Sequence, residues 1–402
     1  MANAPTWIAV PTYWTHPSSA PGEELTVFDH PTPLDEDGTL ARTLDSFCKL
    51  SGDFSVLIVA AGTHPQIGAQ VHAKVIEVIK PFAKNFPLYL VSPANLGELN
   101  NLLPEPLLKL DGYGNIRNVQ LAAPYLAGAS AVVGIDDDEV VEIPDYLTKV
   151  TKHIGSRVNG ETVGGMAGPY FDRKGDYRLG DAETLARHPN IFLKKNYYMN
   201  EALKKAMAPA ATEIVKNNVA FGGNMVMSRE TIARICHDPY IPRGEDYDYV
   251  INAAMDGISF FFQPGMWVTH LPPDSTGSQA GDKASKLVAD IRRFIYMREK
   301  TRVYRELFPE GPLDFCYLMP YPGVYLDASI DLTLHGVRAL DEKYPDYRKS
   351  HSPEKLVEDA VSVASRKARE FFAYQDKWRA ALAAASRSPR SADVVNGFAV
   401  NG

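Results

Sequence analysis

Four short apolar runs near the start of the chain most constrain the fold, because helical patterns separate them. The runs cover residues 6–13, 54–62, 88–93 and 130–135, and their continuous apolar character is typical of strands buried on both faces. Residues 40–50, 67–83 and 114–128 carry apolar side chains at helical spacing. This alternation predicts an α/β fold with a mostly parallel central sheet covered on both sides. Ligands bind such sheets beyond the carboxyl ends of the strands.

The second half of the chain is less regular. We expect strand and hairpin material at 163–181, strands at 219–228 and 258–270, and helices at 200–218 (interrupted near Pro209) and 244–257. Turn-forming residues at 271–285 predict a mobile loop, and 286–307 and 355–385 predict further helices. The tail, 386–402, is expected to be disordered.

Composition excludes several classes of protein. The net charge of -7 and the pI near 5.8 disfavour a nucleic-acid binder that works through a basic surface. Three widely spaced cysteines indicate neither a disulfide framework nor a zinc site. The N-terminus lacks the basic and apolar regions of a signal peptide, and no apolar segment approaches the roughly 20 residues that span a bilayer. We expect a cytoplasmic protein without a transmembrane segment.

The fourth predicted strand runs directly into an acidic cluster, Asp136-Asp137-Asp138-Glu139. Mg²⁺ and Mn²⁺ prefer hard oxygen ligands, and two carboxylates in an Asp-x-Asp pattern at a strand end can point at one ion. Diphosphate oxygens would fill other coordination positions. The plain alternative is a solvated acidic turn, or the N-terminus of a following helix, where anions are also favoured.

A second acidic cluster, Glu245, Asp246 and Asp248, opens a predicted helix. Helix-dipole compensation explains such a cluster without any function. In a cleft, Asp246 or Glu245 could instead take a proton from an attacking hydroxyl. His270 ends a predicted strand, where it is either a structural histidine or a metal ligand.

Two further features lie near these acids. Arg117, on the helix before the Asp-rich strand, is either solvated or placed to pair with phosphate. Gly222 and Gly223 permit a tight turn or the close approach of a sugar ring to the main chain.

Taken in order, these segments resemble the inverting family 2 glycosyltransferases, which have the GT-A fold of the nucleotide-diphospho-sugar transferases. The resemblance covers about residues 6–270. Four matches carry it: IAVPTYW; TLARTLDSF, displaced by an insertion at about 14–38; NLGELNN followed by GNIRNVQLAAPYLAGASAVVGIDDDE; and FGGNMVMSRE followed by GEDYDYVINAAMDGISFFFQPGMWVTH. No single motif is decisive, but four in this order are specific.

The resemblance implies a role for each matched residue. The donor nucleotide sugar would contact Pro11, Thr12, Tyr13, Arg117, Asp136, Asp137, Gly222 and Gly223. A divalent cation, Mn²⁺ or Mg²⁺, would be held by Asp136, Asp138 and His270, with Asp138 favoured as the direct ligand. Asp246, of the Glu245-Asp246 pair, matches the catalytic base.

One departure from the family pattern concerns the nucleobase. The family's second strand usually ends in acidic residues that hold the base and ribose, whereas this one ends in Ala60-Ala61-Gly62. Base recognition, and hence uridine or guanosine, is not fixed by this segment. Thr63 or His64 could take over the hydrogen bonds.

The resemblance predicts a glycosyltransferase that moves a sugar from a nucleoside diphosphate sugar to an acceptor hydroxyl with inversion. Three alternatives stay open: a retaining GT-A transferase that uses the same metal residues, a sugar nucleotidyltransferase, and a non-catalytic binding protein. The retaining transferase is the closest of these. The missing basic N-terminal loop disfavours the nucleotidyltransferase.

The implied organisation is a catalytic domain at 1–270, with a donor half at about 1–140 and an acceptor half at about 141–270. A loop and helical extension follow at 271–385, and then the tail. The acceptor is a small molecule, a glycan or a lipid-linked sugar, so contact with the membrane surface stays open, as does a homo-oligomer. No nucleic-acid partner is expected.

Overall fold

The structure is a computed structural model that describes residues 5–17, 28–180, 186–188, 190–208, 213–273, 280–328, 333–338 and 352–401. Its centre is one large sheet with the strand order β10-β12-β8-β11-β5-β1-β3-β4. The bounds of these strands are, in that order, Val215–Lys216, Ser259–Phe262, Glu161–Ala167, Met225–Ser228, Ala131–Gly134, Thr6–Thr15, Phe54–Gly62 and Leu88–Val91. Two short strands, β2 (Thr32–Pro33) and β7 (Arg157–Val158), pair with β1 and β8.

Most strands of this sheet run in one direction. β1 is parallel to both β3 and β5, β3 is parallel to β4, and β8 is parallel to β12. β11 is antiparallel to β5 and β8, and β10 is antiparallel to β12. The prediction of an α/β fold with a mostly parallel sheet and a helical C-terminal part is therefore confirmed.

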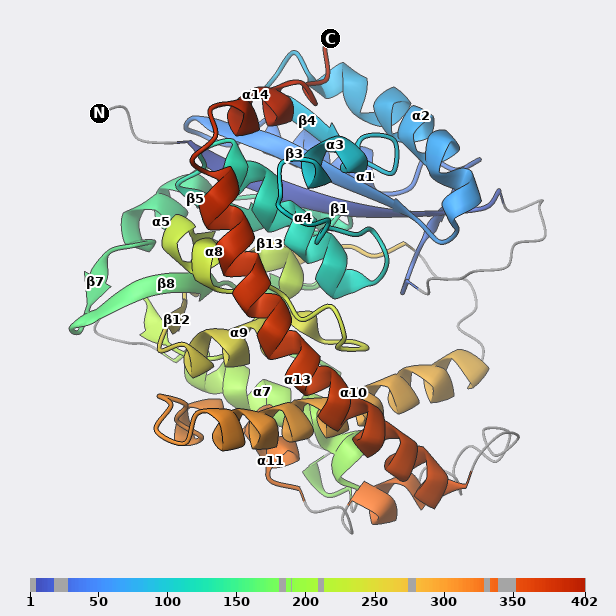
Figure 1. Cartoon of the computed structure of the whole chain (residues 1–402), viewed down its shortest axis with the longest axis vertical. Helices are drawn as coiled ribbons and strands as arrows, with labels where there is room; N and C mark the ends of the chain where they lie inside the picture. Colours follow the sequence, from blue (N-terminus) through green and yellow to red (C-terminus); the bar gives the residue numbers. More distant parts are fainter. Residues whose placement is uncertain are drawn as a thin grey trace.

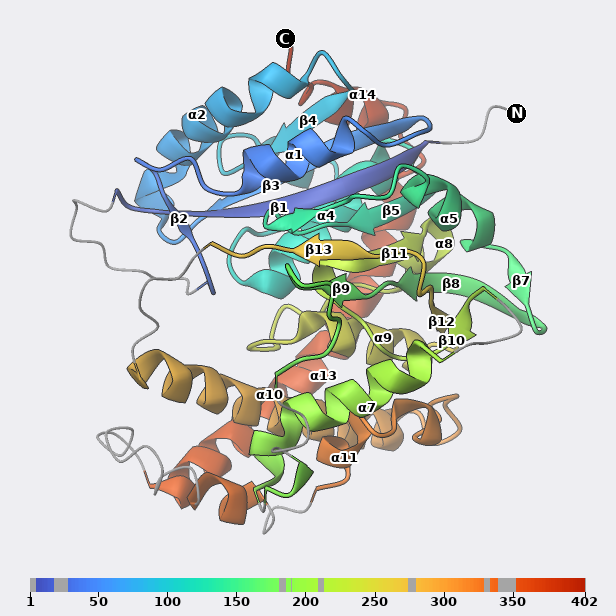
Figure 2. The same ribbon diagram turned by 180° about the vertical axis from the view of Figure 1, so that it is seen from behind.

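Alternate residues of β1 explain why helices cover both faces, because successive side chains of a strand point to opposite sides. Trp7 and Ala9 pack in the cluster that contains α4 (Tyr113–Leu126). Ile8 and Val10 pack in the cluster that contains α1 (Leu40–Phe47) and α2 (Gly68–Ile79). Figure 1 views the sheet from the α4 side, and Figure 2 views it from the α1 side.

A second, three-stranded sheet lies beside the first. It consists of β6 (Glu139–Val140), β13 (Val268–His270) and β9 (Tyr170–Phe171), with β13 in the middle (Figure 2). β13 is antiparallel to β6 and parallel to β9, and Glu139 stands directly opposite His270. This pairing brings the Asp-rich segment and the end of β13 together.

The remaining helices mostly follow in the second half. Their bounds are α3 Leu96–Asn100, α5 Tyr146–His153, α7 Lys195–Ala206, α8 Arg229–Arg234, α9 Glu245–Met255, α10 Ala280–Leu307, α11 Gly323–Leu326, α13 Pro353–Ala385 and α14 Arg390–Asn396. Short 3-10 turns cover Pro65–Ile67, Lys80–Phe82, Ile191–Lys194, Gly222–Asn224 and Cys316–Leu318. None of the helices within the described ranges is both long and apolar enough to cross a membrane.

Several predicted boundaries in the second half are wrong. The expected strand at 258–270 is two strands, β12 and β13, in different sheets, because a turn closed by a hydrogen bond from Met266 N to Gln263 O interrupts it. The expected hairpin at 163–181 is β8 and β9, which likewise join different sheets. Residues 274–279 of the expected loop lie outside the described residues, and α10 already begins at Ala280, inside it. The helix predicted within 200–218 begins earlier, at Lys195, and ends at Ala206, and the interruption predicted near Pro209 lies outside the described residues.

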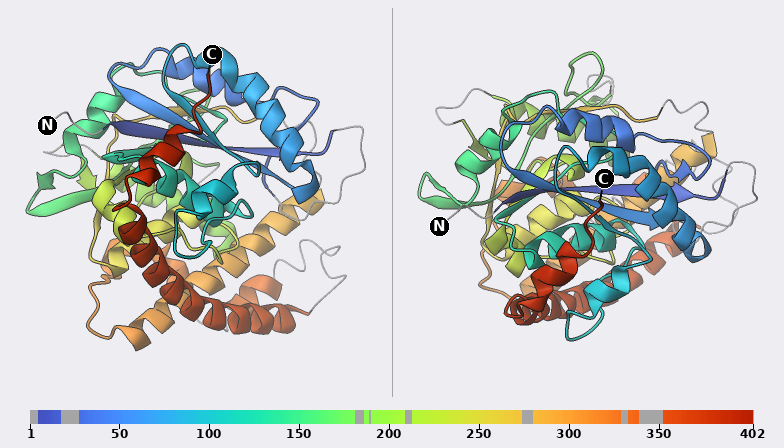
Figure 3. Two further views of the ribbon diagram at one scale, coloured as in Figure 1. Left: turned by 45° about the horizontal axis from the view of Figure 1, so that its top comes forward. Right: turned by 90° about the horizontal axis from the view of Figure 1, so that it is seen from above.

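The prediction of a disordered C-terminal tail is also wrong. Residues 390–396 form α14, and the chain then runs along the edge strand β4 (Figure 3). Leu90 N donates to Phe398 O at 3.1 Å, and Val400 N donates to Leu88 O at 2.8 Å. The tail is ordered because Val395 and Phe398 are buried and because the edge strand offers unpaired backbone groups.

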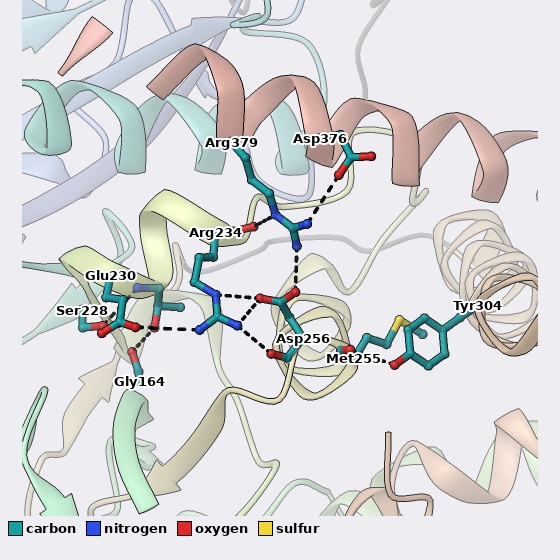
Figure 4. A network of polar contacts seen from close by, with 10 residues as sticks. Gly164, Ser228, Glu230, Arg234, Met255, Asp256, Tyr304, Asp376 and Arg379 are labelled. Atoms are coloured by element: carbon teal, nitrogen blue, oxygen red, sulfur yellow. Dashed lines mark hydrogen bonds and ion pairs between the residues drawn. The ribbon is translucent and has the colours of Figure 1, made fainter. Parts of the chain in front are cut away.

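Helix α13 is attached to α8 and to the end of α9 by polar contacts as well as by packing (Figure 4). The Asp256 carboxylate, after α9, accepts hydrogen bonds from Arg234 of α8 and Arg379 of α13, each at 2.8 Å. Trp378 of α13 donates from Nε1 to the carbonyl of Ile232 at 2.8 Å. The C-terminal helices therefore form part of the same folded body as α8 and α9.

Candidate active site

The fourth predicted strand ends beside the middle of the first. β1 and β5 are parallel neighbours in which Ala9 stands opposite Gly134, and Ile135 N donates to Ala9 O at 3.2 Å. The residues that follow Gly134, which include the three aspartates, therefore emerge beside the C-terminal half of β1. This is the edge where ligands of parallel sheets bind.

The three β1 residues predicted to contact the donor differ in their accessibility. Pro11 and Thr12 are buried within the strand, whereas Tyr13 is half-buried. The ring of Tyr13 lies 4.4 Å from that of Phe28 and 5.4 Å from that of Tyr113. Phe28 and Tyr113 were not predicted, because neither stands in a recognisable motif. We call these three rings the aromatic patch.

Arg117 bridges the two acidic clusters rather than facing solvent. Its guanidinium Nη2 lies 2.7 Å from Asp136 Oδ1, and its Nε lies 3.4 Å from Glu245 Oε1. Burial alone would lower the pKa of Arg117, but the charges of Asp136 and Glu245 raise it, so the guanidinium stays charged. Burial in turn raises the pKa of Asp136, against the opposing charge of Arg117.

Gly222 and Gly223 lie in the 3-10 turn before β11, where neighbouring side chains leave no room for a Cβ. A Cβ on Gly222 would lie 2.5 Å from Arg117 Nη2, and one on Gly223 would lie 2.1 Å from Glu139 Oε2. Gly223 N donates to the Tyr170 hydroxyl at 2.6 Å. Both glycines therefore permit close packing around the acidic segment.

Glu139 is a site residue to which sequence analysis gave no role, although it stands in the acidic run. Its side chain is fully buried, and Oε2 accepts a hydrogen bond from the backbone N–H of Asp136 at 2.9 Å. Burial, followed by the charges of Asp136 and Asp138, raises its pKa well above the usual value. Through this hydrogen bond, Glu139 fixes the backbone of the aspartate segment, Asp136–Asp138.

Asp138 and His270, which are 132 residues apart in sequence, are in contact. His270 Nε2 lies 3.2 Å from Asp138 Oδ2, and Leu271 N donates to Asp138 O at 2.8 Å. The ring of Tyr170 stacks on His270 at 5.5 Å. Burial alone would lower the pKa of His270, but the hydrogen bond to Asp138 and the charges of Asp138 and Asp136 raise it.

The donor chemistry of this corner suits a divalent cation. Two carboxylates and an imidazole provide oxygen and nitrogen ligands. Burial and the charge of the neighbouring Asp138 raise the pKa of Asp137 to about 8, so the ionised form of this carboxyl is disfavoured in this corner. Within the described residues, no group of three or more His, Cys, Asp or Glu side chains is arranged so that it could hold a metal ion. Asp136, for its part, is turned toward Arg117.

The three acids of the second cluster have different surroundings. Glu245 is buried against Arg117, and burial, together with the charge of Asp246, raises its pKa to about 7. Asp248 is fully buried and pairs with Lys300 of α10, which also lies 3.1 Å from Asp238. Asp246 is half-buried, the most accessible of the three. Asp248 is therefore a structural residue, and the pairing with Lys300 had no sequence signal.

The side chains of the two residues considered for nucleobase recognition already form hydrogen bonds within the protein. Thr63 is fully buried, and its hydroxyl donates to Thr15 Oγ1 at 3.1 Å. His64 is half-buried, and its Nδ1 accepts from Gln66 N at 3.1 Å, while its ring lies 5.9 Å from that of His16. Of the two, His64 keeps some accessible surface.

Comparison with known proteins gives no family assignment. No family model matches the chain, and no curated protein matches it. The solved structures to which it is similar include the mannosyltransferase PcManGT from Pyrobaculum calidifontis in complex with GDP-Man and Mn²⁺ (14% identity, 96% of this chain and 87% of that chain covered, TM-score 0.48). GalNAc-T7 with UDP, GalNAc and Mn²⁺ is 12% identical, with 86% and 58% covered and a TM-score of 0.41.

A third similar structure is glucosyl-3-phosphoglycerate synthase from Mycobacterium tuberculosis in complex with Mg²⁺ and UDP. It is 15% identical, with 72% of this chain and 80% of that chain covered and a TM-score of 0.31. All three TM-scores are below 0.5, so the functional argument rests on the site itself.

Proposed function

We propose that this protein is a metal-dependent glycosyltransferase of the GT-A type, as the sequence resemblance implies. The observation that carries the proposal is the contact between Asp138 and His270, 3.2 Å apart at the carboxyl end of the parallel strands. A carboxylate and an imidazole from distant segments, beside two further aspartates, form a corner suited to a cation and a diphosphate.

Asp136, Asp138 and His270 would hold the divalent cation. When bound, this cation supplies Lewis-acid neutralisation of the charge that develops on the leaving diphosphate. Within the aromatic patch, the half-buried rings of Tyr13 and Tyr113 offer flat apolar surface to the nucleobase, and the buried ring of Phe28 packs against both. The donor is then a nucleoside diphosphate sugar.

Asp246 is the proposed general base, and its surroundings favour it over Glu245. Glu245 is buried against the guanidinium of Arg117, whereas Asp246 is half-buried beside it at the N-terminus of α9. The acceptor oxygen attacks the anomeric carbon as its proton passes to Asp246. The bond from that carbon to the diphosphate breaks with inversion of configuration.

The test is a screen of UDP- and GDP-sugars for turnover that requires Mn²⁺ or Mg²⁺. Asp246→Asn should lower transfer by about 10²- to 10⁴-fold while the variant still binds donor, since a general base contributes about that much. The matched control is Asp145→Asn, which changes an exposed carboxylate at the start of α5. Normal transfer by Asp246→Asn would refute the base assignment.

The configuration of the product separates the inverting from the retaining mechanism. NMR of the anomeric proton in the product reports it directly. A product with retained configuration would refute Asp246 as the general base of an inverting reaction. It would leave the proposed metal ligands, Asp136, Asp138 and His270, unchanged. Failure of every nucleotide sugar to turn over, with or without metal, would refute the proposed function itself.

A further inference from the structure

Three basic side chains from three different elements converge on one carboxylate near Asp246. Lys195 Nζ, at the start of α7, lies 2.6 Å from Asp290 Oδ2 of α10. Arg293 Nε lies 3.2 Å from Asp290 Oδ1, and Arg243 Nε lies 4.0 Å from the same oxygen. We call Lys195, Arg243 and Arg293 the cation cluster.

The cation cluster adjoins the proposed base directly. Arg243 precedes Gly244, the N-cap of α9, and Asp246 is the second residue of that helix. Gly244 has a φ of 73°, and a Cβ there would lie 2.1 Å from Arg293 Nη1. Arg293 therefore packs against the backbone that carries Asp246.

The cation cluster also reaches the aromatic patch. Arg243 Nη2 donates to Asp29 Oδ2 at 2.9 Å, and the backbone N–H of Asp29 donates to the Tyr113 hydroxyl at 2.6 Å. The cluster thus lies between the proposed nucleobase surface and the proposed base. An acceptor poised for attack would occupy this side of the site.

The three cations of the cluster lie close enough together to repel one another. They face the carboxylates of Asp290 and Asp29, and the charge of Asp246 also acts on Arg293. Burial lowers the pKa of Lys195, and the charges of Arg293 and Arg243 lower it further, despite the ion pair with Asp290. Burial alone would raise the pKa of Asp290, yet the three cations hold it below its usual value. An added anion beside Lys195 would offset the repulsion from the two guanidinium groups.

Two members of the cluster are accessible to a ligand. The side chains of Lys195 and Arg243 are 26% and 28% exposed, whereas Arg293 is buried and donates to the Tyr321 hydroxyl at 2.7 Å. Arg293 Nε and Asp290 Oδ1, both buried, lack a well-formed hydrogen bond even though they face each other. The site thus combines one buried cation, Arg293, with two partly exposed cationic side chains.

We propose that Lys195 and Arg243, backed by Arg293, bind an anionic group, a carboxylate or a phosphate, on the acceptor. This inference rests on the proposed function, and it names the acceptor class as an anionic molecule that carries a hydroxyl group. Ammonium and guanidinium groups bind such anions through charge-assisted hydrogen bonds. The anion would anchor the acceptor so that its hydroxyl faces Asp246.

The test measures anion binding without donor or metal, so that it does not depend on turnover. Calorimetric titrations in EDTA use inorganic phosphate and glycerol 3-phosphate as probes. We expect Lys195→Gln to weaken binding by about tenfold or more, since one charge-assisted hydrogen bond is lost. Lys195→Arg keeps the charge and should restore most of the affinity. The control is Lys216→Gln, which removes a surface lysine paired with Glu161.

A vesicle arm distinguishes a free anion from a lipid headgroup. Cosedimentation with phosphatidylglycerol vesicles, against phosphatidylcholine vesicles, should depend on Lys195 if a lipid phosphate is the anchor. The inference is supported if the protein binds the free anions or the phosphatidylglycerol vesicles, and if that binding is lost in Lys195→Gln and kept in Lys195→Arg. No binding, or equal binding by wild type and Lys195→Gln in both arms, overturns it.

The two proposals fail separately. If a nucleotide sugar turns over but no anion binds through Lys195, the acceptor inference is wrong and the proposed function stands. If anions bind through Lys195 but no nucleotide sugar turns over, the site binds anions for another purpose, and the acceptor role falls with the proposed function.

Discussion

Replacement of Gly223 by alanine tests whether the Glu139 carboxylate fixes the backbone of the aspartate segment. The new Cβ would lie 2.1 Å from Glu139 Oε2 and 2.5 Å from its Cδ, so the carboxylate must retreat by about 1 Å. Glu139 is fully buried and cannot swing into solvent. Its hydrogen bond from Asp136 N, 2.9 Å long, would break.

The expected cost follows from these two effects. Overpacking of a buried site costs about 1–3 kcal/mol, and loss of a buried hydrogen bond costs about 1–3 kcal/mol. Gly223→Ala should therefore lower the free energy of unfolding by about 2–6 kcal/mol. Urea denaturation followed by tryptophan fluorescence would show a midpoint lower by about 0.7–2 M, for a slope of about 3 kcal/mol/M.

Two further variants make the reasoning refutable. Gly97→Ala, in α3, meets no atom within 4 Å and should be neutral or stabilising by up to about 1 kcal/mol. In a Glu139→Ala background the carboxylate is gone, so Gly223→Ala should cost less than about 1 kcal/mol. The same cost in both backgrounds would refute the steric argument.

Two other predictions concern buried charges. Lys300→Met leaves Asp238 and Asp248 buried without their cation, so we expect a loss of about 3–5 kcal/mol in unfolding free energy. Lys216→Met, which breaks an exposed pair, should cost at most about 1 kcal/mol; equal urea midpoints for the two variants would contradict the prediction. Burial raises the pKa of Glu245 from 4.5 to about 7, so the folded state holds this proton more tightly than the unfolded chain. The stability gained from that proton is complete below about pH 4.5 and is lost as the pH rises through 7. Glu245→Gln cannot ionise, so its urea midpoint should change less between pH 5 and pH 8 than that of wild type, and an equal change would count against the assignment.

The sheet was predictable where local pattern decides structure. The four apolar runs of the first half are β1, β3, β4 and β5, because a strand buried on both faces needs a continuous apolar sequence. The second half was less predictable. Gln263–Met266 forms a turn within an apolar stretch, and that turn sends β12 and β13 to different sheets.

The C-terminal tail shows why composition misled the prediction. Its polar, small residues are typical of disorder, but Val395 and Phe398 find a buried surface and β4 offers a free edge. Order in this segment depends on a partner more than 300 residues away in sequence, so no local pattern could show it.

The sequence by itself determined which groups stand at the strand ends. It placed Asp136–Asp138 after an apolar strand and Glu245–Asp246 at a helix start, since both positions follow from local periodicity. The sequence did not determine which side chains surround each acidic residue, or which acidic residues pair with the same basic side chain.

Only the tertiary structure decided those partners. Pairing of β6 with β13 places His270 against Asp138, Arg117 lies between Asp136 and Glu245, and Lys300 neutralises Asp248. The physical reason is that a charge is stabilised by whatever lies within a few ångströms of it. For buried groups, those neighbours are set by strand pairing and helix packing between segments far apart in sequence.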